Sequence, residues 1–219
     1  MPSPDKSSKR ALILVDLQED FCEGGALAIT GGRAVAARCS KLLAAETSRW
    51  DLIAATRDWH EAGNDNGGHL SAHPDFKDTW PAHCLQGTPG AAYAAELKLP
   101  EEVLEVFKGQ GKPAYSGFQG TTVAGGLLGD ILREEGIREV EVVGLAFDYC
   151  VAQTALDAAR LGFKTTVLMP LTAAVGDPTA ARATLATAGV FLERDLPQEL
   201  ADLLEACPPL NLPHPQALS

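Results

Sequence analysis

The 219-residue sequence has no long hydrophobic run. The longest apolar stretch near its start, residues 11–15, is far shorter than a transmembrane helix or the apolar part of a secretion signal, and Asp16 follows it directly. This absence argues against a membrane protein and against a secreted one. We therefore expect a protein of the cytoplasm.

Basic residues are also few. The chain has 18 Lys and Arg against 29 Asp and Glu, which gives a formal net charge of −11. Binding to phosphate backbones needs a basic patch, and the basic residues here are dispersed. We therefore expect no nucleic-acid partner and favour a small-molecule ligand.

The sequence has no CxxC pair. Its cysteines form an odd, scattered set, which argues against a disulfide framework and leaves at least one thiol free. They are Cys22, Cys39, Cys84, Cys150 and Cys207.

What is present is the composition of an ordinary globular protein, with 46% hydrophobic and 21% charged residues. A chain of this length fits one large α/β domain. Residues 1–9 are polar and rich in Pro and Ser, and residues 207–219 contain four prolines, so both ends are predicted to be irregular tails. Residues 10–206 are predicted to form a single domain.

Two hydrophobic periodicities alternate along this domain. Apolar, strand-forming runs recur at 11–16, 51–57, 105–109, 138–146, 164–170 and 190–194. Helical spacing of apolar residues is found at 32–50, 123–136, 151–162 and 177–189. Strands alternating with helices, and strands that are apolar on both faces, predict a three-layer α/β/α fold with a mostly parallel sheet of about six strands.

Residues 58–100 do not follow this pattern. They are rich in Gly, Pro and Asn, and loops of that length are usually functional or disordered. The segment holds two tryptophans and most of the histidines of the chain: Trp59, Trp80, His60, His69, His73 and His83. We expect an ordered, metal-binding loop.

Ionisable residues follow four of the expected strands. Asp16 ends the first, Asp58 and His60 follow the second, Lys108 ends the third, and Cys150 lies a short turn beyond the fourth. Because parallel strands end at the same edge of a sheet, where ligands bind, these side chains are predicted to share one cleft. Each alone has an ordinary structural interpretation, but together they indicate a catalytic site.

Cys150 is predicted to lie at the start of the helix 151–162. Unpaired backbone amides there would lower the pKa of its thiol, although a single cysteine is more often a packing residue. Asp58 and His60 are two residues apart on extended chain and project to the same side. With His83 and His69 they suit Zn²⁺, Mn²⁺ or Fe²⁺.

Long blocks of the sequence resemble nicotinamidase/pyrazinamidase motifs of the isochorismatase-like hydrolase superfamily. The blocks are ALILVDLQEDFCEGGALAITGG, ATRDWH, WPAHCLQGTPGA, VFKG, AYSGF and VVGLAFDYCVAQTALDA. They follow the family order across roughly residues 11–175 and are jointly specific. The resemblance implies an isochorismatase-like fold and hydrolysis of nicotinamide to nicotinate and ammonia, and of pyrazinamide to pyrazinoate, in NAD salvage.

By this resemblance Asp16, Lys108 and Cys150 match the catalytic triad of the family, with Cys150 as the nucleophile that forms a thioester. The oxyanion hole would consist of the backbone amides of Ala146 and Cys150, next to a cis peptide between Leu145 and Ala146. Water for thioester hydrolysis would be activated by Asp16 or supplied by the metal.

The resemblance also implies one divalent transition metal, zinc, manganese or iron. Asp58, His60 and His83 match its ligands. The family varies in length around the fourth ligand, which leaves His73 as an alternative, but His69 is favoured because the PDF that follows resembles the family pattern at a fixed distance from a ligand.

A small aromatic pocket is implied as well. The matching positions are Phe21, Leu27, Trp80, Tyr115 and Tyr149. Tyr149 stands where some relatives have a histidine, and Phe147 where smaller residues are common, so both bear on the specificity for the ring.

Two other functions remain open from the sequence. Another amidase of the superfamily, acting on a carbamoyl amide or a ureide, would keep the triad without needing the metal. A non-catalytic metal-binding module is the alternative outside enzymes. The oligomeric state is open too, and assembly into a homo-oligomer is compatible with the sequence.

Overall fold

The structure, a computed structural model, describes residues 8–195 and 201–202. The predicted tail 207–219 lies outside the described residues, as does 1–9 except for Ser8 and Lys9. The limits 10–206 of the domain therefore remain a prediction. No helix in the described part of the chain combines the length and apolarity needed to span a bilayer.

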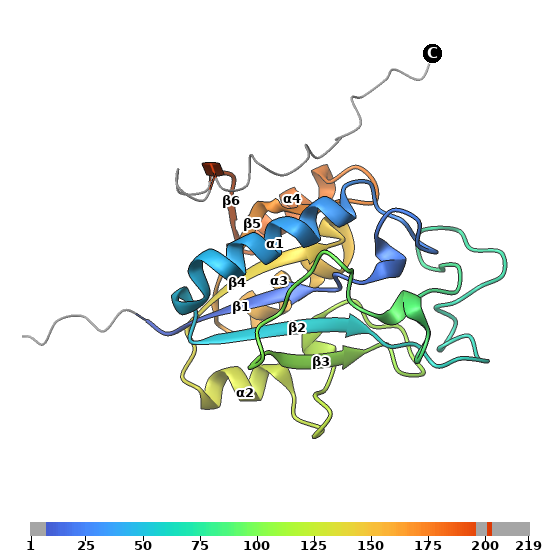
Figure 1. Cartoon of the computed structure of the whole chain (residues 1–219), viewed down its shortest axis with the longest axis horizontal. Helices are drawn as coiled ribbons and strands as arrows, with labels where there is room; N and C mark the ends of the chain where they lie inside the picture. Colours follow the sequence, from blue (N-terminus) through green and yellow to red (C-terminus); the bar gives the residue numbers. More distant parts are fainter. Residues whose placement is uncertain (1–7, 196–200, 203–219) are drawn as a thin grey trace, which may run out of the picture.

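One six-stranded sheet organises the chain, and all of its neighbouring strands pair in parallel (Figure 1). The strands are β1 (Arg10–Val15), β2 (Leu52–Asp58), β3 (Leu104–Lys108), β4 (Glu139–Leu145), β5 (Lys164–Ala173) and β6 (Phe191–Glu193). Their order across the sheet is β3-β2-β1-β4-β5-β6. Each strand overlaps one of the predicted apolar runs, so the predicted α/β fold is confirmed.

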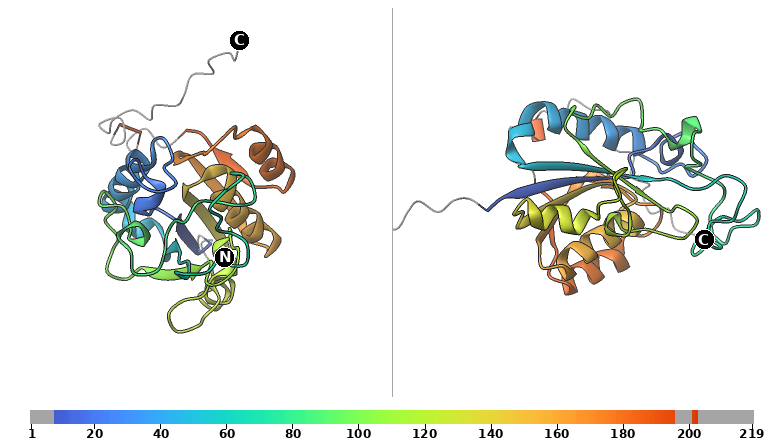
Figure 2. Two further views of the ribbon diagram at one scale, coloured as in Figure 1. Left: turned by 90° about the vertical axis from the view of Figure 1, so that its right-hand side faces the viewer. Right: turned by 90° about the horizontal axis from the view of Figure 1, so that it is seen from below.

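Helices cover both faces of this sheet and make three layers. The helices are α1 (Gly32–Glu46), α2 (Leu128–Glu134), α3 (Ala152–Arg160) and α4 (Thr179–Thr187). Figure 2 shows α1 on one face and the other three helices on the opposite face. Each face has its own apolar core, with Leu42 of α1 in one and Leu156 of α3 in the other.

All four helices are shorter than the predicted helical segments. The first ends at Glu46, and its last turn continues as a 3-10 turn, Thr47–Arg49. The predicted helix 123–136 begins only at Leu128, because Gly125 takes a left-handed conformation (φ +83°) in a turn that closes ahead of it. The spacing of apolar residues gives no sign of such a turn, so it predicted a helix that starts too early.

The direction of strand progression reverses between β1 and β4. From β1 the chain builds toward β3, and from β4 it builds toward β6, so a crevice opens beyond the carboxyl ends of these two central strands. The strands approach closely at Gly144, where an added Cβ would lie 2.1 Å from the Val15 carbonyl oxygen. Glycine is required there, and its φ of +115° also excludes most side chains.

The long connection between β2 and β3 extends past the carboxyl ends of the strands (Figure 1). Buried Asn66 cross-links it: its Oδ1 accepts hydrogen bonds from the backbone N–H of Glu61 (2.8 Å) and of Gly111 (3.1 Å). This connection is thereby tied to the segment after β3, and His69 lies three residues farther along.

Candidate active site

Asp16 is the first residue after β1 and has a left-handed backbone (φ +47°) that is uncommon for a residue other than glycine. Its side chain is fully buried. The hydroxyl of Thr56 on β2 donates to Asp16 Oδ1 (2.6 Å) and accepts from the Asp16 N–H (3.2 Å). One side chain therefore holds both the backbone and the carboxylate of Asp16 in place.

Lys108, at the end of β3, connects the strand ends. Its Nζ lies 2.8 Å from Asp16 Oδ2 and 2.5 Å from Asp58 Oδ1, and it donates to the Ala114 carbonyl at 3.2 Å. The Cys150 Sγ is 3.5 Å from the same nitrogen. The structure thus brings together the three residues predicted as a triad, and it adds Asp58 as a second carboxylate on the lysine.

These buried charged groups shift one another's pKa values. Burial alone would lower the pKa of Lys108, but Asp16 and Asp58 outweigh it and keep the lysine charged. Burial raises the pKa of Asp16, and Lys108 opposes that rise only in part. For Asp58 the lysine and the neighbouring imidazoles overcome burial and hold the pKa well below its usual value. Asp16 is therefore the carboxylate suited to take up a proton, and Asp58 stays ionised.

The expectation that Cys150 has a lowered thiol pKa is wrong. Cys150 is 6% exposed, and burial raises the pKa of its thiol well above the usual value, with Lys108 acting against that rise and Asp16 adding to it. Cys150 also lies within a π-helical turn, Phe147–Val151, that precedes α3. Burial therefore favours the protonated thiol, and a carboxylate oxygen of Asp16 lies within 4.8 Å of its sulfur.

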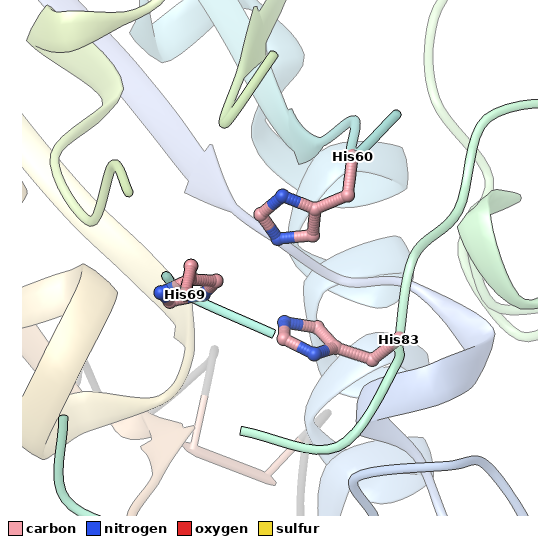
Figure 3. A group of neighbouring side chains, drawn as sticks. All are labelled: His60, His69 and His83. Atoms are coloured by element: carbon pink, nitrogen blue, oxygen red, sulfur yellow. The ribbon is translucent and has the colours of Figure 1, made fainter. Parts of the chain in front are cut away.

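Three imidazoles meet beside this group (Figure 3). Ligand atoms of His60, His69 and His83 lie within 4.8 Å of one another. Asp58 Oδ2 is 3.8 Å from the Nε2 atoms of both His60 and His83. The predicted set of one carboxylate and three imidazoles is therefore assembled in one place.

The hydrogen bonds of these imidazoles fit a bound cation. The Nδ1 of His60 faces the Gly109 carbonyl (2.9 Å) and the Nδ1 of His83 faces the Pro81 carbonyl (2.7 Å), so both Nδ1 atoms donate and both Nε2 lone pairs point inward. His60 Nε2 and His69 Nδ1 are buried without a hydrogen-bond partner. Burial lowers the pKa of His69 to about 4, so it is neutral at neutral pH and free to ligate.

His69 and His73 occupy different environments. His69 is buried against Tyr115 with ring centroids 5.6 Å apart, whereas His73 is exposed. We expect His69→Ala to reduce the metal content of the purified protein and His73→Ala to leave it unchanged, because only His69 belongs to the cluster. Metal measured by plasma mass spectrometry checks this, and equal losses in the two variants would contradict it.

A pocket lies over Cys150 and this cluster. Its lining includes every predicted pocket residue: Phe21, Leu27, Trp80, Tyr115 and Tyr149. The indole N–H of Trp80 donates to the Tyr115 hydroxyl (3.0 Å), and the Tyr149 ring meets Trp80 edge-on at 5.0 Å. The aromatic wall is therefore held by its own contacts.

Phe147 does not line this pocket. It is almost fully buried in the core on the side of α3 and α4, where the Arg182 guanidinium lies 5.9 Å from its ring. The interpretation of Phe147 as a specificity residue is therefore wrong, because the π-helical turn directs its side chain away from the pocket. Ala146 does line the pocket, and the peptide between Leu145 and Ala146 is cis, as the family resemblance implies.

Several residues around the site were not predicted from the sequence. Ile29 and Val175 complete the pocket lining. The Gln18 side chain accepts from the Asp58 N–H (2.8 Å) and donates to the Asp58 carbonyl (2.9 Å), so it fixes the end of β2. Its place two residues after Asp16, at the same sheet edge, was the available signal.

The sheet and the site together define a class of α/β protein in which a buried thiol and two carboxylates surround one lysine ammonium, beside a cluster of candidate metal ligands. A model of the isochorismatase domain matches residues 10–193 of the chain. The chain belongs to the isochorismatase family.

Individual relatives agree with this assignment. The chain is 47% identical over 185 residues to the nicotinamidase/pyrazinamidase of Mycobacterium tuberculosis, and the alignment covers 84% of this chain and 97% of that protein. The pyrazinamidase of Pyrococcus horikoshii, solved in complex with zinc, is similar with a TM-score of 0.73 and 32% identity over 85% of this chain and 99% of that one. A protein from L. infantum, solved in complex with nicotinate, has a TM-score of 0.72 and 33% identity over 88% of this chain and 94% of that one.

Proposed function

We propose that this chain is an amidohydrolase that converts nicotinamide to nicotinate and ammonia, and pyrazinamide to pyrazinoate, in NAD salvage. One observation carries the proposal: Cys150 and the ligand cluster of Asp58, His69 and His83 face the same small aromatic pocket. A flat, ring-bearing amide fits such a pocket, with its carboxamide at the thiol and its ring nitrogen at the cluster. The names of the relatives support the same chemistry.

In the first half of the reaction Asp16 accepts the proton of the Cys150 thiol, and the sulfur attacks the carboxamide carbon. Lys108 lies between the two groups and stabilises thiolate and carboxylate alike. Three ionisable groups in such contact titrate together, so the apparent pKa values of a pH-rate profile will belong to the triad.

The tetrahedral oxyanion would be held by the backbone N–H groups of Ala146 and Cys150, and losing one such donor typically costs about 100-fold in rate. Asp16 then returns its proton to the departing ammonia as the carbon–nitrogen bond breaks. Water activated by Asp16 cleaves the carbon–sulfur bond of the thioester, which releases nicotinate and restores the thiol.

Asp58, His60, His69 and His83 would hold one divalent transition ion, zinc, manganese or iron, since this donor set suits all three. Bound there, the ion would supply a Lewis-acid contact that orients the ring through its nitrogen. Elemental analysis of the purified protein identifies the ion.

We expect chelation to lower kcat/KM for nicotinamide about 100-fold, because a ring without its anchor misplaces the carboxamide against Cys150. An ammonia-release assay before and after chelation measures this, and added Zn²⁺, Mn²⁺ or Fe²⁺ should restore activity. Pyrazinamide serves as the second substrate, and a carbamoyl amide serves as the substrate of the rival amidase. Chelation-resistant release from the carbamoyl amide alone would replace the proposal with that rival function.

We also propose that the protein acts in the cytoplasm on the free small molecule. Cell fractionation with an antibody against the chain tests the location. Light scattering coupled to size exclusion shows whether the chain forms a homo-oligomer.

A further inference from the structure

Val175 is a large apolar side chain that remains 45% exposed although it lines the pocket. It lies in the turn between β5 and α4, at the mouth of the pocket, where an incoming ligand would cover it. Val123, in contrast, is 88% exposed on a loop and does not line the pocket. Apolar area left open at a pocket mouth is what substrate binding would bury.

The turn that carries Val175 is anchored by Asp148. The N–H of Val175 donates to Asp148 Oδ1 (2.9 Å), and the N–H of Gly176 donates to Oδ2 (2.8 Å). Both carboxylate oxygens are therefore committed to holding this one turn. Asp148 itself belongs to the π-helical turn that carries Cys150, two residues away.

Both ends of the turn are fixed as well. Ala173, at the end of β5, is paired with Leu145 of β4. At the other end Asp177 accepts the N–H of Thr179, the first residue of α4, at 3.0 Å. The backbone of Val175 is thus tied to the turn that carries Cys150, and these bonds oppose the displacement that a larger ring would require.

We propose that Val175 is a specificity-determining residue that limits substituents on the ring of the substrate, and that Asp148 is the positioning residue that makes this wall rigid. The inference rests on the proposed function, since it concerns the size of the carboxamide that this same pocket accepts. The substrate class is then a pyridine or pyrazine carboxamide without bulky ring substituents.

Val175→Ala tests the wall directly. We expect kcat/KM for at least one isomer in a series of ring-methylated nicotinamides to rise about tenfold relative to that for nicotinamide, because a methyl group in an apolar pocket is worth about 10-fold or more. Nicotinamide itself should show a higher KM with little change in kcat. Val123→Ala is the matched control, and its ratio of kcat/KM for the methylated compound to that for nicotinamide should equal that of the wild type.

Asp148→Ala tests the anchor. We expect the ratio of kcat/KM for the methylated nicotinamide to that for nicotinamide to rise, as in Val175→Ala, because Val175 is still present but its turn is no longer held. Asp148→Asn keeps one acceptor oxygen, so its ratio should lie between those of the wild type and Asp148→Ala. Metal content should stay at the wild-type level in both. A general loss of structure would instead lower the rates on all substrates together and leave the ratio unchanged.

Binding gives a readout that does not depend on turnover. Calorimetric titration of nicotinate and its ring-methylated analogues should show the same preference shift in Kd. A ratio within about twofold of wild type in both assays would overturn the inference and leave the proposed function standing. If the wild type releases no ammonia from nicotinamide, the proposed function fails, and the titrations still decide whether Val175 limits the ring.

Discussion

Replacement of Cys150 by alanine is expected to abolish ammonia release from nicotinamide, with kcat falling at least about 10⁴-fold, as for the nucleophiles of other covalent hydrolases. The thiol lies beside both Asp16 and Lys108, and without it no thioester forms. The metal ligands are separate side chains, so the bound metal and the affinity for nicotinate should be retained.

The measurement is an ammonia-release assay combined with metal analysis and calorimetric binding of nicotinate. Mass spectrometry of acid-quenched wild type should in addition detect a nicotinoyl group on Cys150. Cys39→Ala is the control, because Cys39 is equally buried but lies in the core around α1, away from the pocket. Turnover by Cys150→Ala would rule out the nucleophile assignment.

The second large effect concerns Lys108, whose replacement by methionine should lower both stability and activity. Methionine matches the aliphatic part of the lysine side chain but lacks the ammonium, so the buried carboxylates of Asp16 and Asp58 lose their shared cation. Breaking a buried ion pair from one side typically costs about 3–5 kcal/mol in the free energy of unfolding. Activity should fall as well, because the ammonium no longer stabilises the Cys150 thiolate.

Urea denaturation of the metal-loaded protein measures the loss of stability. Lys112→Met, which alters an exposed lysine, should change the free energy of unfolding by no more than about 0.5 kcal/mol. The double variant Lys108→Met with Asp16→Asn should recover part of the loss, because it also removes the uncompensated charge. A Lys108→Met protein as stable as the wild type would show that this ion pair contributes nothing to folding.

The fold was largely predictable because its signals are local. A strand buried on both faces must be apolar throughout, as β1 is from Ala11 to Val15, and a helix against a sheet must repeat apolar residues every three to four positions. The predicted helix 123–136 began too early, because the left-handed turn at Gly125 delays the start of α2 and the apolar spacing does not show such a turn.

Much of the candidate site was predictable for a topological reason. Parallel strands end at one edge, so Asp16, Asp58, Lys108 and Cys150 had to approach one another once the strands were recognised. The histidines of the long connection were harder to place, since loop residues have no register. The family resemblance favoured His69 over His73, and the structure puts His69 in the cluster.

Other features depend on contacts between distant segments. Gln18 holds Asp58 across 40 residues of chain, and Asp148 holds Val175 across 27. The thiol pKa of Cys150 likewise depends on burial, which no helix-start argument supplies. Phe147 and Tyr149 are neighbours in sequence, yet one packs in the core and the other lines the pocket.

The sequence by itself therefore determined the parallel α/β fold and the residues that meet at the sheet edge, since these depend on periodicity and strand ends, while the resemblance of its motif blocks indicated the family. Tertiary structure alone decided which side chains face the pocket, which groups hold them and how burial sets their protonation. Those properties arise from contacts between segments far apart in the chain, and local pattern carries no information about them.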